Sequence, residues 1–481
     1  MGKNFGGAVG MAFEGWPGPR LSAAAPSVPS AVPNDDFEMQ LMALAAIERS
    51  GRWPEPEEMA RIWQDHLGFA PDEYGVALRN LREGILPPAS GATDNFFAHG
   101  MGAVIRSELW ACLCPDDPEA AATLAANDAG IDHAGEGVLG AAFLAALQSA
   151  AFGGADLEQS IAAAASLLPM HSVLPDVVSV TGRLAMDNVS DEDAIRACHE
   201  TFGSANFTDC IMNLAFILLA LRRGSGDVMA SLHFALRCGE DADCTCASVG
   251  ATLGILHGPP ACPAWEGSSE RLAISPDFLA LDPPRSLSEL VDRVGRLRDR
   301  MRGQPVAAWP SCQPLKPYPH TWLVVAASDA LDEPSAIQEL VSKPDRLSSA
   351  IRSFNGYCGT LTGQSPVAWH LLSHITLSED FDGWLLLVAE AGLTAWIDGR
   401  ILLNCHNRKP IIPAFHRTEG GASVAIQLKA HHQYKLHIRL LHPQCSARFV
   451  VALADFKGHY VPNFRFRYVT NSAGNVASCG S

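Results

Sequence analysis

The spacing of apolar residues along this chain changes from a helical to a strand period, and this change constrains the fold most. Alanine-rich and leucine-rich stretches at 120–126, 141–151 and 211–221 have the composition of closely packed helices. The last helical pattern is amphipathic and covers residues 287–301. Beyond residue 319, short apolar runs alternate with polar residues between turn residues, which is typical of strands.

This division, and a length of 481 residues that exceeds one ordinary core, predict two domains. We expect an all-helical domain over residues 1–304. Five prolines at 305–319 favour an extended linker. Residues 320–470 are expected to form an antiparallel β-sandwich, and the small polar residues 471–481 a flexible tail. The runs that read as strands are 383–388, 393–400, 422–428, 434–440 and 448–453.

Two acidic motifs, Asn34-Asp35-Asp36 and Asp241-Ala242-Asp243, lie about two hundred residues apart, each beside an apolar helical segment. Neighbouring carboxylates repel, and a hard divalent cation with oxygen ligands is the usual remedy in a folded protein. Capping is the alternative, because aspartate also caps helix N-termini. Glycines at 250, 254 and 258 follow the second motif and predict a bare helix face that lets another helix approach closely.

Five motifs occur in the order typical of one family over residues 1–265, and through them the chain resembles the ADP-ribosylglycohydrolases. The two acidic motifs are similar to that family's metal-binding motifs. The remaining three are Gly7 to Glu14, Gly100 to Arg106 and Asn127 to His133. The resemblance implies an all-helical hydrolase fold that removes ADP-ribose from proteins or small molecules.

The metal ligands that the resemblance implies are Asn34, Asp35, Asp36, Asp241, Asp243 and Cys244. Cys244 stands where the family has a threonine, and a thiol suits magnesium poorly. Either Thr245 takes over that position through a local shift, or the metal position is weaker or differently filled. All-oxygen ligands otherwise favour two Mg²⁺ ions, with Mn²⁺ as the alternative and zinc disfavoured.

Hydrolysis at the ribose anomeric carbon builds oxocarbenium character, so the site needs an activated water and help for the leaving group. The resemblance implies catalytic roles for Glu14, Asp35 and Asp36, with Glu14 as general acid, general base or water-positioning group. Glu14 is alternatively an ordinary surface carboxylate, and Trp16 either stacks on a base or packs against apolar groups. The residues expected to bind substrate are Gly100, Gly102, Arg106, Asp132 and His133.

For His133 the alternative is a satisfied core histidine. The substrate is expected to be an ADP-ribosylated protein or a related ribosyl or nucleoside-like small molecule, cleaved at an N- or O-glycosidic bond. A non-catalytic ligand-binding or structural role on the same fold is the second hypothesis. The Asp398-Gly399 turn resembles hairpins of the lectin-like sandwiches that accompany glycosidases, so the β domain either binds carbohydrate or substrate or serves structure or dimerisation.

The net charge of −17, without a basic stripe, argues against nucleic acid as a partner. No window is long and apolar enough to cross a bilayer, and the first residues lack a secretory signal pattern. Thirteen cysteines without disulfide-scaffold spacing fit a reducing compartment, so we expect a cytoplasmic protein.

Overall fold

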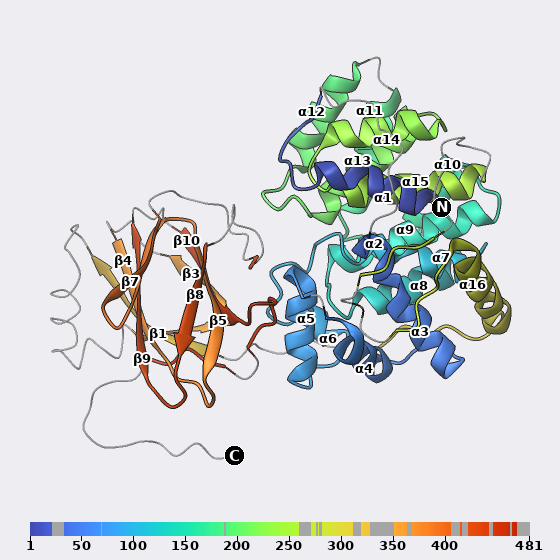
Figure 1. The fold of residues 1–481 in the computed structure, drawn as a ribbon. Helices are drawn as coiled ribbons and strands as arrows, with labels where there is room; N and C mark the ends of the chain where they lie inside the picture. The colour runs from blue at the N-terminus through green and yellow to red at the C-terminus, as the bar shows by residue number, and fades with distance from the viewer. Residues whose placement is uncertain are drawn as a thin grey trace. The chain divides into compact units, whose positions relative to one another are not determined.

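The chain divides into two compact units, Met1–Pro314 and Leu315–Ser481, each described below by itself (Figure 1). The computed structural model describes residues 1–21, 33–68, 70–186, 189–258, 271–275, 278, 281–310, 319–327, 351–362, 368–405, 414–415, 422–441, 446–461 and 464–468. The predicted tail at 471–481 and most of the predicted linker lie outside these residues.

In the first unit, the regular elements that the structure describes are helices (Figure 1). Its helices are α1 (Gly2–Gly10), α2 (Asp35–Glu38), α3 (Gln40–Ser50), α4 (Pro56–His66), α5 (Asp72–Arg82), α6 (Ala89–Ala92), α7 (Glu108–Leu113), α8 (Pro118–Ala129), α9 (Glu136–Phe152), α10 (Leu157–Ala165), α11 (Leu174–Met186), α12 (Asp191–Phe202), α13 (Cys210–Arg223), α14 (Val228–Cys238), α15 (Ala242–His257) and α16 (Leu287–Met301), with 3₁₀ turns η1 (Met11–Phe13) and η2 (Val104–Arg106).

Two hydrophobic clusters form the core of this unit. One lies around α9, α13, α14 and α15, and the other around α3, α4, α5, α7, α8 and α16. Helix α9 is buried on almost all sides and contacts α7, α8, α10, α13 and α15. Its alanines and glycines allow this, because small side chains let several helices pack around one axis. The predicted mainly helical bundle is therefore confirmed.

Helix α1 packs against α15 almost backbone to backbone. A methyl group on Gly6 would overlap the carbonyl oxygen of Cys246, and one on Gly10 would overlap that of Ala242. On the partner helix, a methyl group on Gly250 would overlap the carbonyl oxygen of Gly2. Only glycine permits this approach. The predicted bare face is therefore found at Gly250, whereas Gly258 ends the helix with a φ of 72°.

Side chains cap six of the helices of this unit. An Asp or Ser side chain at the N-cap accepts a hydrogen bond from a first-turn backbone N–H, which satisfies a donor that the helix itself cannot pair. The residues that do so are Asp117, Asp156, Ser190, Asp209, Asp227 and Ser286.

The second unit is an antiparallel β-sandwich, as expected (Figure 1). Its sheets have the orders β2-β1-β4-β9-β6-β7 and β3-β10-β5-β8, and the aromatic rings of Trp322 and Phe354 in one sheet contact Phe449 in the other. The strands are β1 (Pro319–Ala327), β2 (Ile351–Asn355), β3 (Cys358–Thr362), β4 (Ala368–Ile375), β5 (Phe381–Ala389), β6 (Gly392–Ile397), β7 (Arg400–Cys405), β8 (Ala422–Leu428), β9 (Tyr434–Leu441) and β10 (Ser446–Ala454).

The predicted hairpin joins β6 to β7 through Asp398 and Gly399, with φ values of 48° and 79°. Two positive φ values are what a two-residue type I′ turn requires. Elsewhere, among the helices that the structure describes, none is both long and apolar enough for a bilayer span.

Candidate metal centre

The second acidic motif lies where α15 begins. Asp241 occupies the N-cap position, yet its side chain accepts no capping hydrogen bond. Asp209 and Asp227 do so at the same position of α13 and α14. The capping alternative therefore fails for Asp241, and its carboxylate needs another explanation.

Asp241, Asp243 and Cys244 form a cluster of metal-ligand atoms. One atom from each side chain, two carboxylate oxygens and a sulfur, lies within 4.8 Å of the other two. The residues are 2%, 4% and 8% exposed. Burial, followed by the carboxylates of Asp243 and Glu14, raises the pKa of Asp241 well above its usual value. Burial thus disfavours the ionised form of Asp241 unless a cation lies beside it.

A divalent cation fits this cluster. The Oδ2 atom of Asp241 is buried and accepts no hydrogen bond from the residues that the structure describes. Buried polar atoms are normally paired, so an unpaired carboxylate oxygen marks a position where a cation would lie. Carboxylates are hard ligands, and the sulfur of Cys244 is a soft one.

Cys244 is the third residue of this cluster, and Thr245 follows it in the chain. The Thr245 hydroxyl is fully buried and donates a hydrogen bond of 3.1 Å to the carbonyl oxygen of Ala242. That bond lies within the first turn of α15. A ligand position for Thr245 through a local shift stays a prediction.

The first acidic motif opens α2, which contacts both α1 and α15. A methyl group on Gly7 would lie 2.8 Å from the side-chain nitrogen of Asn34 and 3.6 Å from the β-carbon of Ala247 in α15, so the first motif lies close to both α1 and α15. Asp35 is partly exposed, while the side chain of Asp36 lies outside the description. Among the described His, Cys, Asp and Glu side chains, those that form the metal-ligand cluster all belong to the second motif.

Glu14 begins a segment, residues 14–20, that we call the strap. The strap pairs with the residue just before Asp241: Gly15 donates to the carbonyl oxygen of Glu240 at 2.9 Å, and Glu240 donates to that of Trp16 at 3.0 Å. The Glu240 carboxylate also accepts from the Gly18 N–H at 2.6 Å. These bonds hold Glu14 close enough to Asp241 for the charge of Glu14 to raise the pKa of Asp241.

Arg106 lies at the centre of a buried ion-pair network. Its guanidinium donates to the carboxylate of Asp128 at 2.8 Å and to that of Asp132 at 2.9 Å. Its other bonds go to the carbonyl oxygens of Gly102 and Asp128 and to the second oxygen of Asp132. All five N–H donors are thus used inside the protein. Substrate binding by Arg106 and Asp132 stays a prediction, and this geometry favours a supporting role.

His133 is 1% exposed and contacts the same network. Its Nδ1 atom lies 2.8 Å from a carboxylate oxygen of Asp132, and its Nε2 atom 3.8 Å from one of Glu73. Glu73 also lies where a side chain on Gly102 would be, and Gly100 faces both Glu73 and His133. The predicted substrate residues are therefore neighbours in space, and contact with substrate stays a prediction for each of them.

Tyr74 connects this network with the first acidic motif. Burial raises the pKa of Tyr74 well above its usual value, and the charges of Asp35 and Glu73 raise it further. Sequence reasoning missed Glu73, Tyr74 and Glu240. Glu240 stands inside the second motif and carried a readable signal as an acidic residue beside two aspartates, whereas nothing near Glu73 and Tyr74 marks them out.

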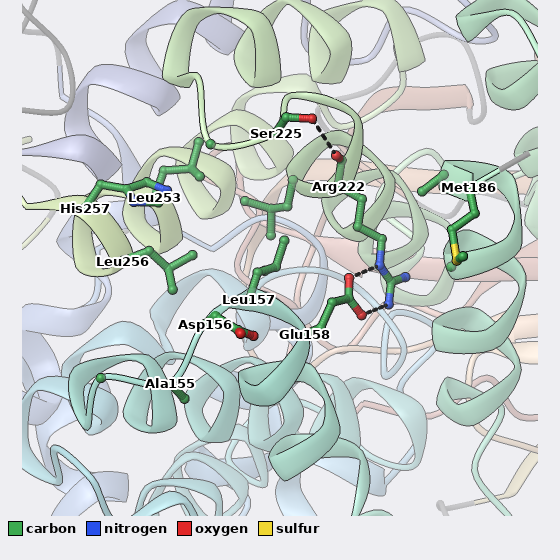
Figure 2. A pocket seen from close by; sticks show the side chains of 15 residues that line it. Ala155, Asp156, Leu157, Glu158, Met186, Arg222, Ser225, Leu253, Leu256 and His257 are labelled. Atoms are coloured by element: carbon green, nitrogen blue, oxygen red, sulfur yellow. Dashed lines mark hydrogen bonds and ion pairs between the residues drawn. The ribbon is translucent and has the colours of Figure 1, made fainter. Parts of the chain in front are cut away.

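A separate pocket of about 750 Å³ contains none of these residues (Figure 2). It is lined by ends of α10, α11, α13 and α15, with leucines 157, 221, 253 and 256 and the ion pair between Arg222 and Glu158. His257, at the C-terminal end of α15, also lines it. Since Asp241 precedes the other end of this 16-residue helix, roughly 24 Å of helix separates the two places.

Comparisons with known proteins identify the helical unit. The family model described as ADP-ribosylglycohydrolase matches residues 1–306. A solved structure described as an ADP-ribosylglycohydrolase-related protein complex is 19% identical, with a TM-score of 0.43, over 62% of this chain and 95% of that one. No curated protein matches this chain.

Two further solved structures match smaller parts of the chain. A β-glucosidase from Kluyveromyces marxianus in complex with glucose is 10% identical, with a TM-score of 0.21, over 28% of this chain and 15% of its own. An anti-sigma factor domain-containing protein from Clostridium clariflavum is 10% identical, with a TM-score of 0.21, over 35% of this chain and 53% of its own. The family model, in contrast, spans more than half of the sequence, and the chain therefore belongs to the ADP-ribosylglycohydrolase family.

Proposed function

We propose that this protein is a metal-dependent hydrolase that cleaves the glycosidic bond of an ADP-ribosylated protein or a related ribosyl compound. Its family is one of glycohydrolases and is generally metal-dependent. The observation that carries the proposal is the buried cluster of Asp241, Asp243 and Cys244, whose charge requires a counterion and whose first residue makes no cap.

Asp241, Asp243 and Cys244 would hold one ion, and Asn34, Asp35 and Asp36 complete the proposed set of ligands for a pair. Contact of α2 with α15 supports this arrangement. A bound divalent cation supplies Lewis-acid polarisation of water and stabilises negative charge near the ribose hydroxyls. Magnesium suits the carboxylate oxygens, and manganese, which binds the same oxygen ligands, is the alternative.

Glu14 is the proposed proton-transfer residue. It is exposed and held beside Asp241 by the strap, so it meets solvent and the acidic cluster together. A carboxyl group in this place can exchange protons with solvent and with a water bound beside the acidic cluster. Asp35 and Asp36 would orient the ribose and the attacking water from the opposite motif.

Gly100, Gly102, Arg106, Asp132 and His133 form the proposed wall of the substrate site. In this proposal Asp132 and Arg106 neutralise each other and fix His133, while the glycines leave space for ligand atoms close to the backbone. Substrate would then contact His133 or the glycine backbone rather than the guanidinium of Arg106, whose N–H donors are already bonded to protein oxygens.

The test is release of ADP-ribose or ribose from arginine-linked, serine-linked and free nucleoside-type substrates. Each is assayed with magnesium, with manganese and with chelator. We expect metal-dependent release from one linkage, which identifies the leaving group. Absence of release from every substrate by folded, metal-loaded protein would contradict the proposal and favour the non-catalytic binding role.

A further inference from the structure

The strap carries a cation that lies over an exposed aromatic ring. The guanidinium carbon of Arg20 lies 3.6 Å from the ring centroid of Trp16. Trp16 is 49% exposed, so apolar packing does not explain its position. Stacking on an indole fixes the plane of a guanidinium while leaving its N–H edges available.

The charge of Arg20 is not neutralised by a carboxylate among the described residues. Its Nε atom is buried and has no hydrogen-bond partner there, and its other contacts are the Trp16 ring and a backbone bond. This is unusual in a chain with 52 acidic and 35 basic side chains. A partly buried cation without a counterion favours the binding of an anion.

Among the described residues, Arg20 makes no ion pair with a carboxylate of the acidic cluster. The largest charge effects on Asp241 come from Asp243 and Glu14. The site therefore offers two distinct regions of opposite sign, an acidic one for cations and a basic one on the strap. A substrate that carries both hydroxyls and anionic groups matches such a pair.

The strap fixes where this basic region lies. The N–H of Arg20 donates to the carbonyl oxygen of Arg237 at 2.7 Å, and Trp16 pairs with Glu240, the residue before Asp241. The Glu240 carboxylate holds the intervening Gly18. Both ends of the Trp16–Arg20 pair are thus anchored to the segment that leads into the acidic cluster, so little ordering is needed when a ligand binds.

We propose that Arg20, held on Trp16, is a specificity-determining residue of this site that binds the anionic groups of the substrate. This inference rests on the proposed function and adds a residue to its substrate site. The guanidinium edge would bind phosphate oxygens through charge-assisted hydrogen bonds while the ribose lies toward the acidic motifs.

The test measures binding of ADP-ribose and of ribose by calorimetry, alongside kcat and KM for an ADP-ribosylated peptide. Proteins compared are the wild type, Arg20→Gln, Arg20→Lys and the control Arg298→Gln, an exposed arginine of α16. We expect Arg20→Gln to weaken ADP-ribose binding about 10- to 100-fold and to raise KM more than it lowers kcat. Arg20→Lys should retain part of the affinity because it keeps the charge.

Ionic strength separates recognition of an anion from a structural role. The affinity for ADP-ribose should fall with added salt in the wild type and in Arg298→Gln, and fall less in Arg20→Gln. Equal affinity and equal salt dependence in wild type and Arg20→Gln would overturn this inference and leave the hydrolase proposal standing. Failure of the wild type both to bind ADP-ribose and to cleave any substrate would overturn both.

Discussion

At the scale of single residues, the position of an acidic side chain decides its role more than its identity does. Asp227 and Asp241 both precede a helix, yet Asp227 caps α14 and Asp241 is buried beside Asp243. The sequence pointed to the second motif because two aspartates recur two positions apart. The sequence could not separate a capping aspartate from a metal-binding one, because capping depends on backbone geometry, which a residue pattern does not display.

This contrast predicts opposite effects of two matched substitutions. Asp227→Ala loses a helix cap and should therefore lower the free energy of unfolding by about 1 kcal/mol. It should leave the stabilisation of the protein by bound metal unchanged. Asp241→Ala should lose no cap and cause no comparable loss in metal-free protein, because a buried carboxylate is removed. Denaturant unfolding with and without Mn²⁺ measures both.

In the same experiment, metal at 100 times its dissociation constant should stabilise the wild type by about 2.7 kcal/mol. Asp241→Ala should lose this gain. If Asp241→Ala were stabilised by metal as much as the wild type, Asp241 would not be a ligand of the metal centre.

At the scale of elements, those with a clear apolar period or composition were predicted. The amphipathic pattern over 287–301 corresponds to α16, whereas β1 to β4 and most of β7 were not predicted. Strand β4 is buried on both faces, so its sequence shows no alternation. The approach of α1 to α15 was predicted from one helix alone, since glycine spacing shows that a partner comes close but not which partner.

Glycine at the α1–α15 contact is predicted to be essential for stability. Gly6→Ala places a methyl group against the backbone of Cys246, which cannot move aside, and should lower the free energy of unfolding by at least about 2 kcal/mol. The control Gly295→Ala lies in open space on α16 and should stabilise by about 0.5–1 kcal/mol. Equal changes in the free energy of unfolding for Gly6→Ala and Gly295→Ala, measured by thermal unfolding, would refute the close contact of α1 with α15.

A histidine pair in the larger sheet predicts acid sensitivity of the β unit. His437 stacks on Trp396, accepts or donates one hydrogen bond with His370 at 3.0 Å, and is 6% exposed. Burial, followed by the charges of His370, Lys435 and Arg439, lowers the pKa of His437 to about 3. The unfolded chain protonates this group near pH 6.5.

Because the unfolded state takes up this proton first, stability from His437 is present above about pH 6.5 and is lost as the pH falls toward about 3. The slope contributed by this one group is at most about 1.4 kcal/mol per pH unit. Imidazole NMR shifts should show His437 neutral from pH 7 to pH 4, with the exposed His432 as the comparison. A His437 midpoint near pH 6 would show that burial does not act as described.

At the scale of the whole molecule, every residue of the proposed site lies in the helical unit. The chain divides at residue 314, and each unit has its own apolar core. Composition and periodicity predicted the two fold types. They could not assign a task to the β-sandwich, because sandwiches serve many functions and its faces show no motif of their own.

We therefore expect residues 1–314 alone to fold, to bind metal and to keep the kcat of the full chain. The physical reason is that the acidic motifs, the strap and their supporting helices all come from this unit. Steady-state kinetics of the truncated and full proteins make the comparison. A folded, metal-binding 1–314 protein with much lower activity would instead give the β-sandwich a part in substrate binding.

The most direct test of the central claim is release of ADP-ribose from ADP-ribosylated arginine and serine peptides by wild type, Asp241→Asn and Asp227→Asn, each with Mg²⁺, with Mn²⁺ and with chelator. We predict that the wild type and Asp227→Asn release ADP-ribose in metal and stop in chelator, while folded Asp241→Asn is inactive throughout. Undiminished release in chelator, or by Asp241→Asn, would contradict a metal-dependent hydrolase built on this cluster.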